Sequence, residues 1–285
     1  FTELADQPFH DVRTMLRQVP VLTRLRADRS VWEFVCRHIS HPKLREALSI
    51  QPLLVGGSPF DTTSIYGLIH YLECSSGVFF AMGGTGAIVA ALGRLMTEQG
   101  IAVRLGTTVS RITLEGRRAT GVALAGGETL AADIVVSNAD PMHLYRAMLP
   151  EHALRLASRL KRRSRLSMGL YVLYFGTRRR YPNVAHHTIW LGPRYRELLD
   201  EIFHMKVLGK DFSLYVHRPT ATDQSFAPAG CDSFYVLCPV PNLLGNIDWT
   251  VEGPRLRDRI VTALDRTLLP GLMDMHTHLT QDYFT

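Results

Sequence analysis

The glycine-rich turn Gly83-Gly84-Thr85-Gly86 has the residue types that let a backbone approach a phosphate or a flat cofactor closely. An apolar run precedes it and a helical pattern follows it, as in dinucleotide-binding sites. From Gly84 the letters read G-T-G-A-I-V, so Val89 stands where that fingerprint needs its third glycine or alanine. The next predicted strand ends in Gly106-Thr107, without an acidic residue to hold a ribose hydroxyl. The turn therefore predicts no complete dinucleotide site, and a helix start that needs tight turns is the alternative.

Histidines suggest two further kinds of chemistry, proton transfer and metal binding. His70 lies on a largely apolar predicted helix and is a candidate general base, although a lone histidine there is more often a packed core residue. His186 and His187 are adjacent and would point to opposite sides of a strand, which makes a poor ligand pair. His276 and His278 have only two aspartates nearby to supply a third ligand. We therefore expect no metal site.

The elements that must position the glycine turn alternate between helix and strand. The turn opens a predicted helix with one buried face, carried by Ile88, Ala91, Leu92, Leu95 and Met96. A strand is predicted at Ala102–Leu105, and a hairpin with its turn at Glu115-Gly116 joins Val109–Leu114 to Gly121–Leu124. Ala132–Ser137 is a continuous apolar run, typical of a strand buried on both faces.

Helices flank this block on its N-terminal side, and strands with helices between them follow it. Residues 9–50 read as three helices, with Asp28 or Ser30 as a cap for the second and His41-Pro42 opening the third. After a loop at Gln51–Phe60, Asp61–Ser64 offers caps for the next helix. Strands are predicted at Ser167–Phe175, Thr188–Leu191, Ser213–His217 and Ser233–Leu237. Helices are predicted at Pro141–Leu149, Glu151–Lys161, Arg194–Met205 and Pro254–Leu268.

Several phrases in this order resemble the amine oxidase and phytoene desaturase superfamily, and most strongly its bacterial phytoene desaturases. The phrases are LLVGGSPFDTTSIYGLIHYLE (Leu53–Glu73), GGTGAIV (Gly83–Val89), SNAD (Ser137–Asp140), LYVLYFG (Leu170–Gly176), AHHTIWLGPRYRELLDEIF (Ala185–Phe203), DFSLYVHRP (Asp211–Pro219) and NIDWTVEGPRLRDRI (Asn246–Ile260). They cover nearly the whole chain, which makes the resemblance more specific than any single motif.

The resemblance implies a fold of class α/β and α+β. It consists of an incomplete FAD-binding Rossmann-like domain, an inserted mixed-sheet substrate domain and a helical membrane-facing region. The implied domains are 1–76 for the helical membrane-contact part, 77–140 for the later part of the FAD domain, and 141–285 for the substrate domain. A first Rossmann unit with G-x-G-x-x-G and a C-terminal flavin segment are absent, so we expect an internal fragment.

FAD is the cofactor that the resemblance implies. Val109 corresponds to the residue whose backbone meets the adenine, and Gly83 and Gly84 are candidates for close approach to the flavin. Ser137 and Asn138 end the last strand of the block and would lie near the cofactor. The family usually reads WGVWFPRGGTG before the glycines, and this chain lacks those tryptophans and the Pro-Arg pair.

The implied activity is FAD-dependent desaturation of phytoene or a related carotenoid to a more conjugated polyene of the lycopene or neurosporene type, carried by the full-length protein. Side chains cannot accept hydride, so a flavin must do so. A hydrocarbon substrate requires an apolar channel, for which the aromatic strands at Leu170–Phe175, Phe212–Val216 and Phe234–Leu237 are candidate walls. The alternatives are another oxidoreductase of the superfamily and a non-catalytic binder of carotenoid or lipid.

Composition and charge bear on whether the partner is a nucleic acid or a membrane. The chain has 285 residues, is 46% hydrophobic and carries a net charge of +6. The basic cluster at Arg159–Arg165 has no interleaved aromatics, so we expect no nucleic acid partner. In the cluster at Arg13–Arg29 apolar residues alternate with arginines, which suits either a peripheral membrane helix or a helix packed on a core. Four scattered cysteines fit a reducing compartment, and we expect a cytoplasmic, peripherally membrane-associated protein.

Overall fold

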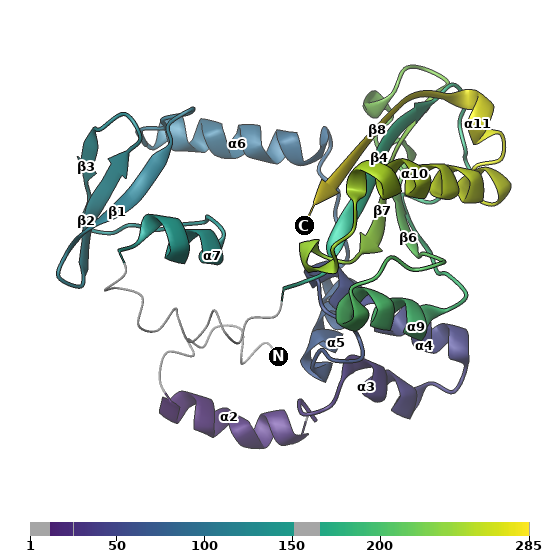
Figure 1. The fold of residues 1–285 in the computed structure, drawn as a ribbon, viewed down its shortest axis with the longest axis horizontal. Coiled ribbons are helices and arrows are strands. Elements are labelled where there is room, and N and C mark those ends of the chain that lie inside the picture. Colours follow the sequence, from purple (N-terminus) through teal and green to yellow (C-terminus); the bar gives the residue numbers. More distant parts are fainter. Residues whose placement is uncertain (1–11, 25, 151–165, 285) are drawn as a thin grey trace. The chain divides into compact units, whose positions relative to one another are not determined.

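The computed structural model describes residues 12–24, 26–150 and 166–284, and of 12–15 and 274–284 it describes the backbone only (Figure 1). The chain divides into two compact units. The larger comprises Phe1–Ala87 and Ser167–Thr285, and the smaller comprises Ile88–Leu166. These units group residues by contact and not by function, so the functional domains expected at 1–76, 77–140 and 141–285 stay a prediction.

The helices predicted at the start of the larger unit are confirmed. They are α2 (Val12–Arg24), α3 (Val31–His38) and α4 (Pro42–Ser49). Ser30 caps α3: its Oγ accepts the Glu33 N–H at 3.1 Å, and its own N–H donates to the Glu33 carboxylate at 3.0 Å. The loop predicted after α4 contains a 3-10 turn, η1 (Gln51–Val55). Thr63 then caps η2 (Ser64–Tyr66), which leads into α5 (Gly67–Ser76).

A five-stranded sheet forms the rest of the larger unit, with its strands in the order β5-β6-β7-β4-β8. The strands are β4 (Gly169–Thr177), β5 (His187–Trp190), β6 (Leu214–His217), β7 (Asp232–Val240) and β8 (His276–Phe284). The four predicted strands are thus confirmed. Every pairing is antiparallel, where we expected a mixed sheet. The reason is that no two neighbouring strands are joined by the right-handed crossover that a parallel pair requires.

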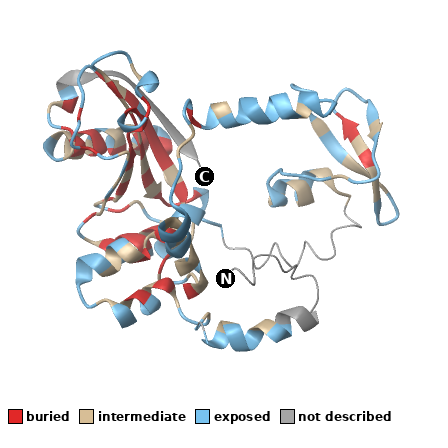
Figure 2. Ribbon diagram, turned by 180° about the vertical axis from the view of Figure 1, so that it is seen from behind, coloured by how far each residue is buried: buried red, intermediate tan, exposed pale blue. Residues whose placement is uncertain are grey.

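Helices and short turns connect these strands. They are α9 (Tyr195–Asp200) with its π-helical continuation η5 (Glu201–Met205), the 3-10 turns η6 (Pro219–Ala221), η7 (Gln224–Phe226) and η8 (Leu243–Gly245), then α10 (Trp249–Arg266) and α11 (Leu272–Met275). Helix α10 covers one face of the sheet (Figures 1 and 2). The core lies between them: Tyr171, Leu173 and Ile260 are fully buried. The Tyr171 hydroxyl donates to the Gly253 carbonyl at 2.7 Å and joins the sheet to α10.

The smaller unit contains the predicted hairpin. Strands β1 (Val109–Glu115) and β2 (Arg118–Leu124) pair antiparallel, and β3 (Thr129–Ala131) adds to β2. Helix α6 (Gly84–Glu98) begins at the glycine turn, as predicted, and belongs mostly to this unit. The short helix α7 (Pro141–His143) continues as the π-helical segment η3 (Leu144–Met148), which confirms helix at Pro141–Leu149. The predicted helix Glu151–Lys161 and the cluster Arg159–Arg165 lie outside the described residues.

Three predictions for this unit are wrong. Ala102–Leu105 and Ala132–Ser137 form no strands, and Leu105 and Val136 are each 89% exposed. The predicted buried face of α6 is also open, with Leu92 54% and Leu95 50% exposed. A strand or helix face is buried only when other elements pack over it. These segments touch other described residues at isolated points, such as the Ala132 N–H that donates to the Thr120 carbonyl at 3.0 Å, and side chains such as Leu105 and Val136 stay open.

No helix among the described residues is both long and apolar enough to cross a bilayer. Helix α2 lies open along its apolar positions, with Leu16 63% and Val19 49% exposed. Of the two alternatives for this helix, packing on a core is not seen among the described side chains of α2.

Candidate functional site

Within the larger unit, the glycine turn at Gly83-Gly84 lies against Asp223 and Phe226. Gly83 and Gly84 have φ angles of +80° and +75°, which glycine adopts at little cost. The Gly83 N–H donates to the Asp223 carboxylate at 2.8 Å. A Cβ on Gly84 would lie 2.8 Å from the Phe226 ring. A side chain at position 84 would therefore require the Phe226 ring to shift, and the positive φ angle favours glycine there as well.

The same turn has a property that a cofactor site needs. A Cβ on Gly86, in the first turn of α6, would meet nothing within 4 Å, so the backbone there is open to approach. A helix N-terminus with such an approach favours anionic groups, because its N–H groups have no partner within the helix. Gly83, Gly84 and Gly86 thus fit the backbone-approach part of a flavin site, and the second and third of them begin α6.

The other predicted flavin residues belong to the smaller unit. Val109 begins β1, is half-buried and pairs with Leu124. Ser137 and Asn138 are exposed in the segment that forms no strand, and Ser137 Oγ accepts the Ala139 N–H at 3.3 Å. Gly83 and Gly84 thus belong to the larger unit, and Val109, Ser137 and Asn138 belong to the smaller unit. That these five residues form one flavin site stays a prediction.

His70 lies on α5 with its side chain 48% exposed, so it is not a packed core residue. Its Nδ1 is 3.8 Å from the Glu73 carboxylate, and its Nε2 is 3.8 Å from Cys74 Sγ. These contacts lie within one helix and orient the ring only weakly. A role for His70 as a base stays a prediction.

The sheet face opposite α10 is rich in aromatic and aliphatic side chains, and we call it the open face. Strand alternation places on it Leu170, Tyr174, His187, Ile189, Tyr215, His217, Tyr235 and Leu237. The Tyr235 ring lies 6.0 Å from that of Tyr174 and 5.8 Å from that of Tyr215. In strands β4 to β7 this face carries no Asp, Glu, Lys or Arg. It is suited to an uncharged, elongated apolar ligand.

Three histidines meet at one end of the open face. The rings of His186 and His187 are 4.4 Å apart, and those of His186 and His217 are 4.7 Å apart. The expectation that the adjacent pair points to opposite sides of a strand is wrong. The reason is that His186 precedes β5, so strand alternation does not separate the two rings. We call these three residues the histidine cluster.

Hydroxyl groups orient the three rings. His186 Nδ1 is 2.5 Å from Thr222 Oγ1, and His187 Nδ1 is 2.6 Å from the Tyr215 hydroxyl. The same hydroxyl is 3.3 Å from His217 Nδ1. Burial lowers the pKa of His187, and burial with the neighbouring His187 and Arg218 lowers that of His186. Burial with the neighbouring His186 and His187 lowers the pKa of His217 to about 4. These shifts all favour the neutral form of the rings.

The histidine cluster adjoins the segment before the glycine turn. The Phe80 ring lies 4.6 Å from that of His186 and 5.9 Å from that of Phe226. Sequence reasoning included Tyr215 only within the candidate wall Phe212–Val216, and it did not select His217 or Asp223. The phrase Tyr-Val-His at 215–217 holds one usable signal, since residues two apart on a strand share a face. Asp223 offers no such signal, because its partner Gly83 is distant in sequence.

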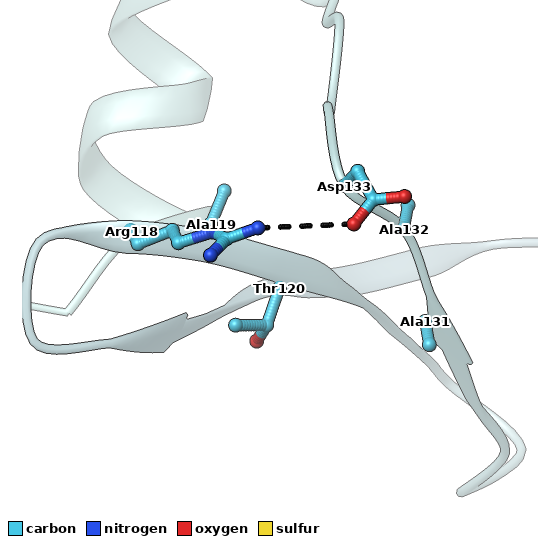
Figure 3. Close-up of a pocket in the computed structure, with 6 residues that line it drawn as sticks. All are labelled: Arg118, Ala119, Thr120, Ala131, Ala132 and Asp133. Carbon is cyan, nitrogen blue, oxygen red and sulfur yellow. Dashed lines mark ion pairs between the residues drawn. The ribbon is translucent and has the colours of Figure 1, made fainter.

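A pocket in the smaller unit is not a second site. It lies at the ends of β2 and β3, lined by Arg118, Ala119, Thr120, Ala131, Ala132 and Asp133 (Figure 3). Its charged groups, Arg118 and Asp133, are 3.8 Å apart with side chains 74% and 99% exposed. Such an exposed pair contributes little energy and is screened by water and salt.

The chain is similar to a family of flavin enzymes and to curated carotenoid desaturases. Residues 12–221 match the model of the flavin containing amine oxidoreductase family. A lycopene-forming phytoene desaturase of Pantoea ananas is 47% identical, over 95% of this chain and 56% of that protein. A neurosporene-forming phytoene desaturase of Cereibacter sphaeroides is 41% identical, over 95% of this chain and 54% of that protein. The chain thus spans about half the length of the curated relatives it matches.

The fold also has a counterpart among solved structures. An oxidoreductase from Methanosarcina mazei aligns with a TM-score of 0.64, over 96% of this chain and 61% of that one. The two sequences are 16% identical, so this likeness concerns the fold alone. The Rossmann-type flavin oxidoreductase fold expected from the sequence is confirmed.

Proposed function

Because this chain belongs to the flavin-containing amine oxidoreductase family, we propose that the full-length protein is an FAD-dependent desaturase of phytoene or a related carotenoid. The observation that carries the proposal is the open face, which offers aromatic rings and no charged group in strands β4 to β7. The names of its relatives, lycopene-forming and neurosporene-forming phytoene desaturases, support the same substrate class.

A carotenoid offers almost nothing to hydrogen-bond, so its binding free energy must come from burying apolar surface. Tyr174 and Ile189, 41% and 42% exposed, have such surface available on the open face. When bound, FAD supplies the acceptor for the hydride that leaves the hydrocarbon. We propose that the glycine turn and the start of α6 hold the flavin, with Val109, Ser137 and Asn138 completing the site.

The exposed apolar segments of the smaller unit support the same proposal. Ala102–Leu105, Ala132–Ser137 and the apolar face of α6 have the composition of buried elements and lie open here. Relatives about twice as long have further chain that can cover such segments. We propose that in the full-length protein the first Rossmann unit packs on these three segments. Ala102–Leu105 and Ala132–Ser137 would then form strands.

The test uses the full-length protein, with phytoene in vesicles and added FAD, and follows the absorbance of conjugated products. We expect conversion by the unaltered protein. Tyr174→Ala is expected to lower kcat/KM by about 10-fold, since losing a half-exposed aromatic contact costs about 1.4 kcal/mol of binding free energy.

Tyr174→Phe is the matched control, because it keeps the ring and removes only the hydroxyl. We expect its kcat/KM to stay within about threefold of the unaltered value. Equal losses in both variants would contradict hydrocarbon packing on the open face. Binding of a coloured polyene without any conversion by the flavin-loaded protein would replace the desaturase with a non-catalytic binder.

Peripheral membrane contact is a further part of the proposal. Helix α2 presents Leu16 and Val19 to solvent beside Arg17 and Arg24, a pattern suited to an anionic bilayer surface. Leu16→Glu is expected to weaken binding to vesicles of anionic lipid by about 10-fold or more, because it removes a leucine that would insert into the bilayer and adds a negative charge that the lipid repels. Co-sedimentation with the vesicles measures the change.

Val251→Glu serves as the control, since Val251 is 43% exposed on α10 and makes the same change of charge. We expect it to bind vesicles like the unaltered protein. If both variants lose binding equally, net charge and not α2 determines the attachment.

A further inference from the structure

The histidine cluster has the composition and spacing of a metal site. His186, His187 and His217 each offer one ring nitrogen, and these nitrogens all lie within 4.8 Å of one another. Three imidazole nitrogens on one tetrahedral ion are about 3.3 Å apart, given metal–nitrogen bonds of about 2.0–2.1 Å. His187 is exposed, so its ring has room to close the remaining gap.

A second observation is the buried ring nitrogen of His186. Its Nδ1 faces the Thr222 hydroxyl at 2.5 Å, and its Nε2 is buried without a hydrogen-bond partner. When Nδ1 donates its proton to Thr222, Nε2 carries a free lone pair and no donor meets it. A buried acceptor in this state is costly, and a cation bound there would satisfy it.

The hydroxyl of Tyr215 orients the other two rings in the way metal ligands require. It lies 2.6 Å from His187 Nδ1 and 3.3 Å from His217 Nδ1, and a hydroxyl oxygen can accept from both. Each ring then keeps its Nε2 for a ligand bond. Metal-bound histidines usually donate their other N–H to an oxygen in this manner.

Arg218 is a fixed positive charge beside the cluster and contributes to the lowered pKa of His186, but it is paired with a buried carboxylate. Arg218 follows His217, is only 5% exposed, and its guanidinium donates to the buried Asp232 carboxylate at 3.0 Å. That carboxylate offsets part of its charge. Aromatic rings of Phe80 and Tyr235 lie 4.6 Å from those of His186 and His217 and exclude water from part of the cluster.

We propose that His186, His187 and His217 bind a divalent transition-metal ion of the zinc type, with a fourth position left for water or a ligand. Imidazole suits Zn²⁺, Co²⁺, Ni²⁺ and Cu²⁺ and disfavours Mg²⁺ and Ca²⁺. The ion would tie the start of β5 to β6. The cluster lies at one end of the open face, and the test of ion binding uses no measurement of desaturase activity.

The test titrates the tag-free chain with Zn²⁺ by calorimetry and with Co²⁺ by visible absorbance. We expect one ion per chain and the absorbance of tetrahedral Co²⁺. His187→Ala should weaken binding by at least about 100-fold, since it removes a ligand. Tyr215→Phe, which removes only the orienting hydroxyl, should weaken it by about 10-fold.

His143→Ala is the matched control, because His143 is exposed in the smaller unit and belongs to no cluster among the described residues. It should bind Zn²⁺ like the unaltered chain. Zn²⁺ should also raise the Tm of the unaltered chain and of His143→Ala but not that of His187→Ala. Far-UV circular dichroism checks that each variant is folded. No saturable binding, or equal binding by His187→Ala, would overturn the proposal.

Discussion

Replacing Asp232 by asparagine is expected to lower the free energy of unfolding of the larger unit by about 3–5 kcal/mol. Asp232 is fully buried on β7. Its carboxylate accepts the Tyr181 N–H and the Thr220 hydroxyl, each at 2.7 Å, and the Arg218 guanidinium at 3.0 Å. The substitution keeps the shape and leaves Arg218, which is 5% exposed, as a buried charge without its partner. Urea unfolding followed by tryptophan fluorescence measures the loss.

The pH dependence gives an independent check. Burial alone would raise the pKa of Asp232, but the hydrogen bonds from Thr220, Tyr181 and Arg218 outweigh it and hold the pKa below the ordinary 3.8. A carboxyl with a lowered pKa binds fewer protons when folded than when unfolded. Its contribution is therefore complete above about pH 4 and is lost as the pH falls through the folded pKa. Asp232→Asn should lack this part of the acid-side loss.

Two further variants test whether the stability loss comes from the buried Asp232–Arg218 pair or from any change of a charged residue. Glu252→Gln removes the half-buried partner of the exposed Arg255 on α10 and should cost less than about 1 kcal/mol. Adding Arg218→Met to Asp232→Asn removes the stranded charge and should restore part of the lost stability. A loss below about 1 kcal/mol in Asp232→Asn would show that the pair does not stabilise the fold.

Local signals predicted most of the larger unit. The capping box of Ser30 and Glu33 and the aromatic strand β4 depend on neighbours within a few residues, which the sequence displays directly. Ala102–Leu105 and Ala132–Ser137 failed for the opposite reason. Their composition is that of buried strands, but a strand forms only with a neighbouring strand along its length, and neither segment is paired as a strand among the described residues.

The histidine cluster depends on the register in which strands β5, β6 and β7 pair. His187 pairs with His217 across β5 and β6, and His217 pairs with Tyr235 across β6 and β7. Pairing between strands distant in sequence is set by the whole sheet, so no spacing within the chain indicated it. The adjacent pair His186-His187 was assigned to opposite faces, because the first residue of β5 was not known. A one-residue change in where a strand begins decides whether two rings meet.

Gly121→Ala is expected to destabilise the smaller unit by about 3 kcal/mol or more. Gly121 lies in β2 at φ +152°, opposite Ala131 of β3. A Cβ there would overlap the Leu130 carbonyl oxygen and approach Ala131 Cα at 3.0 Å. Both are backbone atoms and cannot rotate away, so β3 must separate from β2. Hydrogen exchange of the β1–β3 amides measures the loss.

Gly116→Ala is the matched control within the same hairpin. Gly116 lies in the turn between β1 and β2 at φ +59°, and a Cβ there would meet nothing within 4 Å. Its cost is the left-handed conformation alone, about 1–2 kcal/mol. Equal losses in the two variants would mean that backbone conformation, and not the close approach of β3, makes glycine necessary at 121. A larger loss at 121 would show that the third strand fixes the hairpin, and with it the position of Val109 at the start of β1.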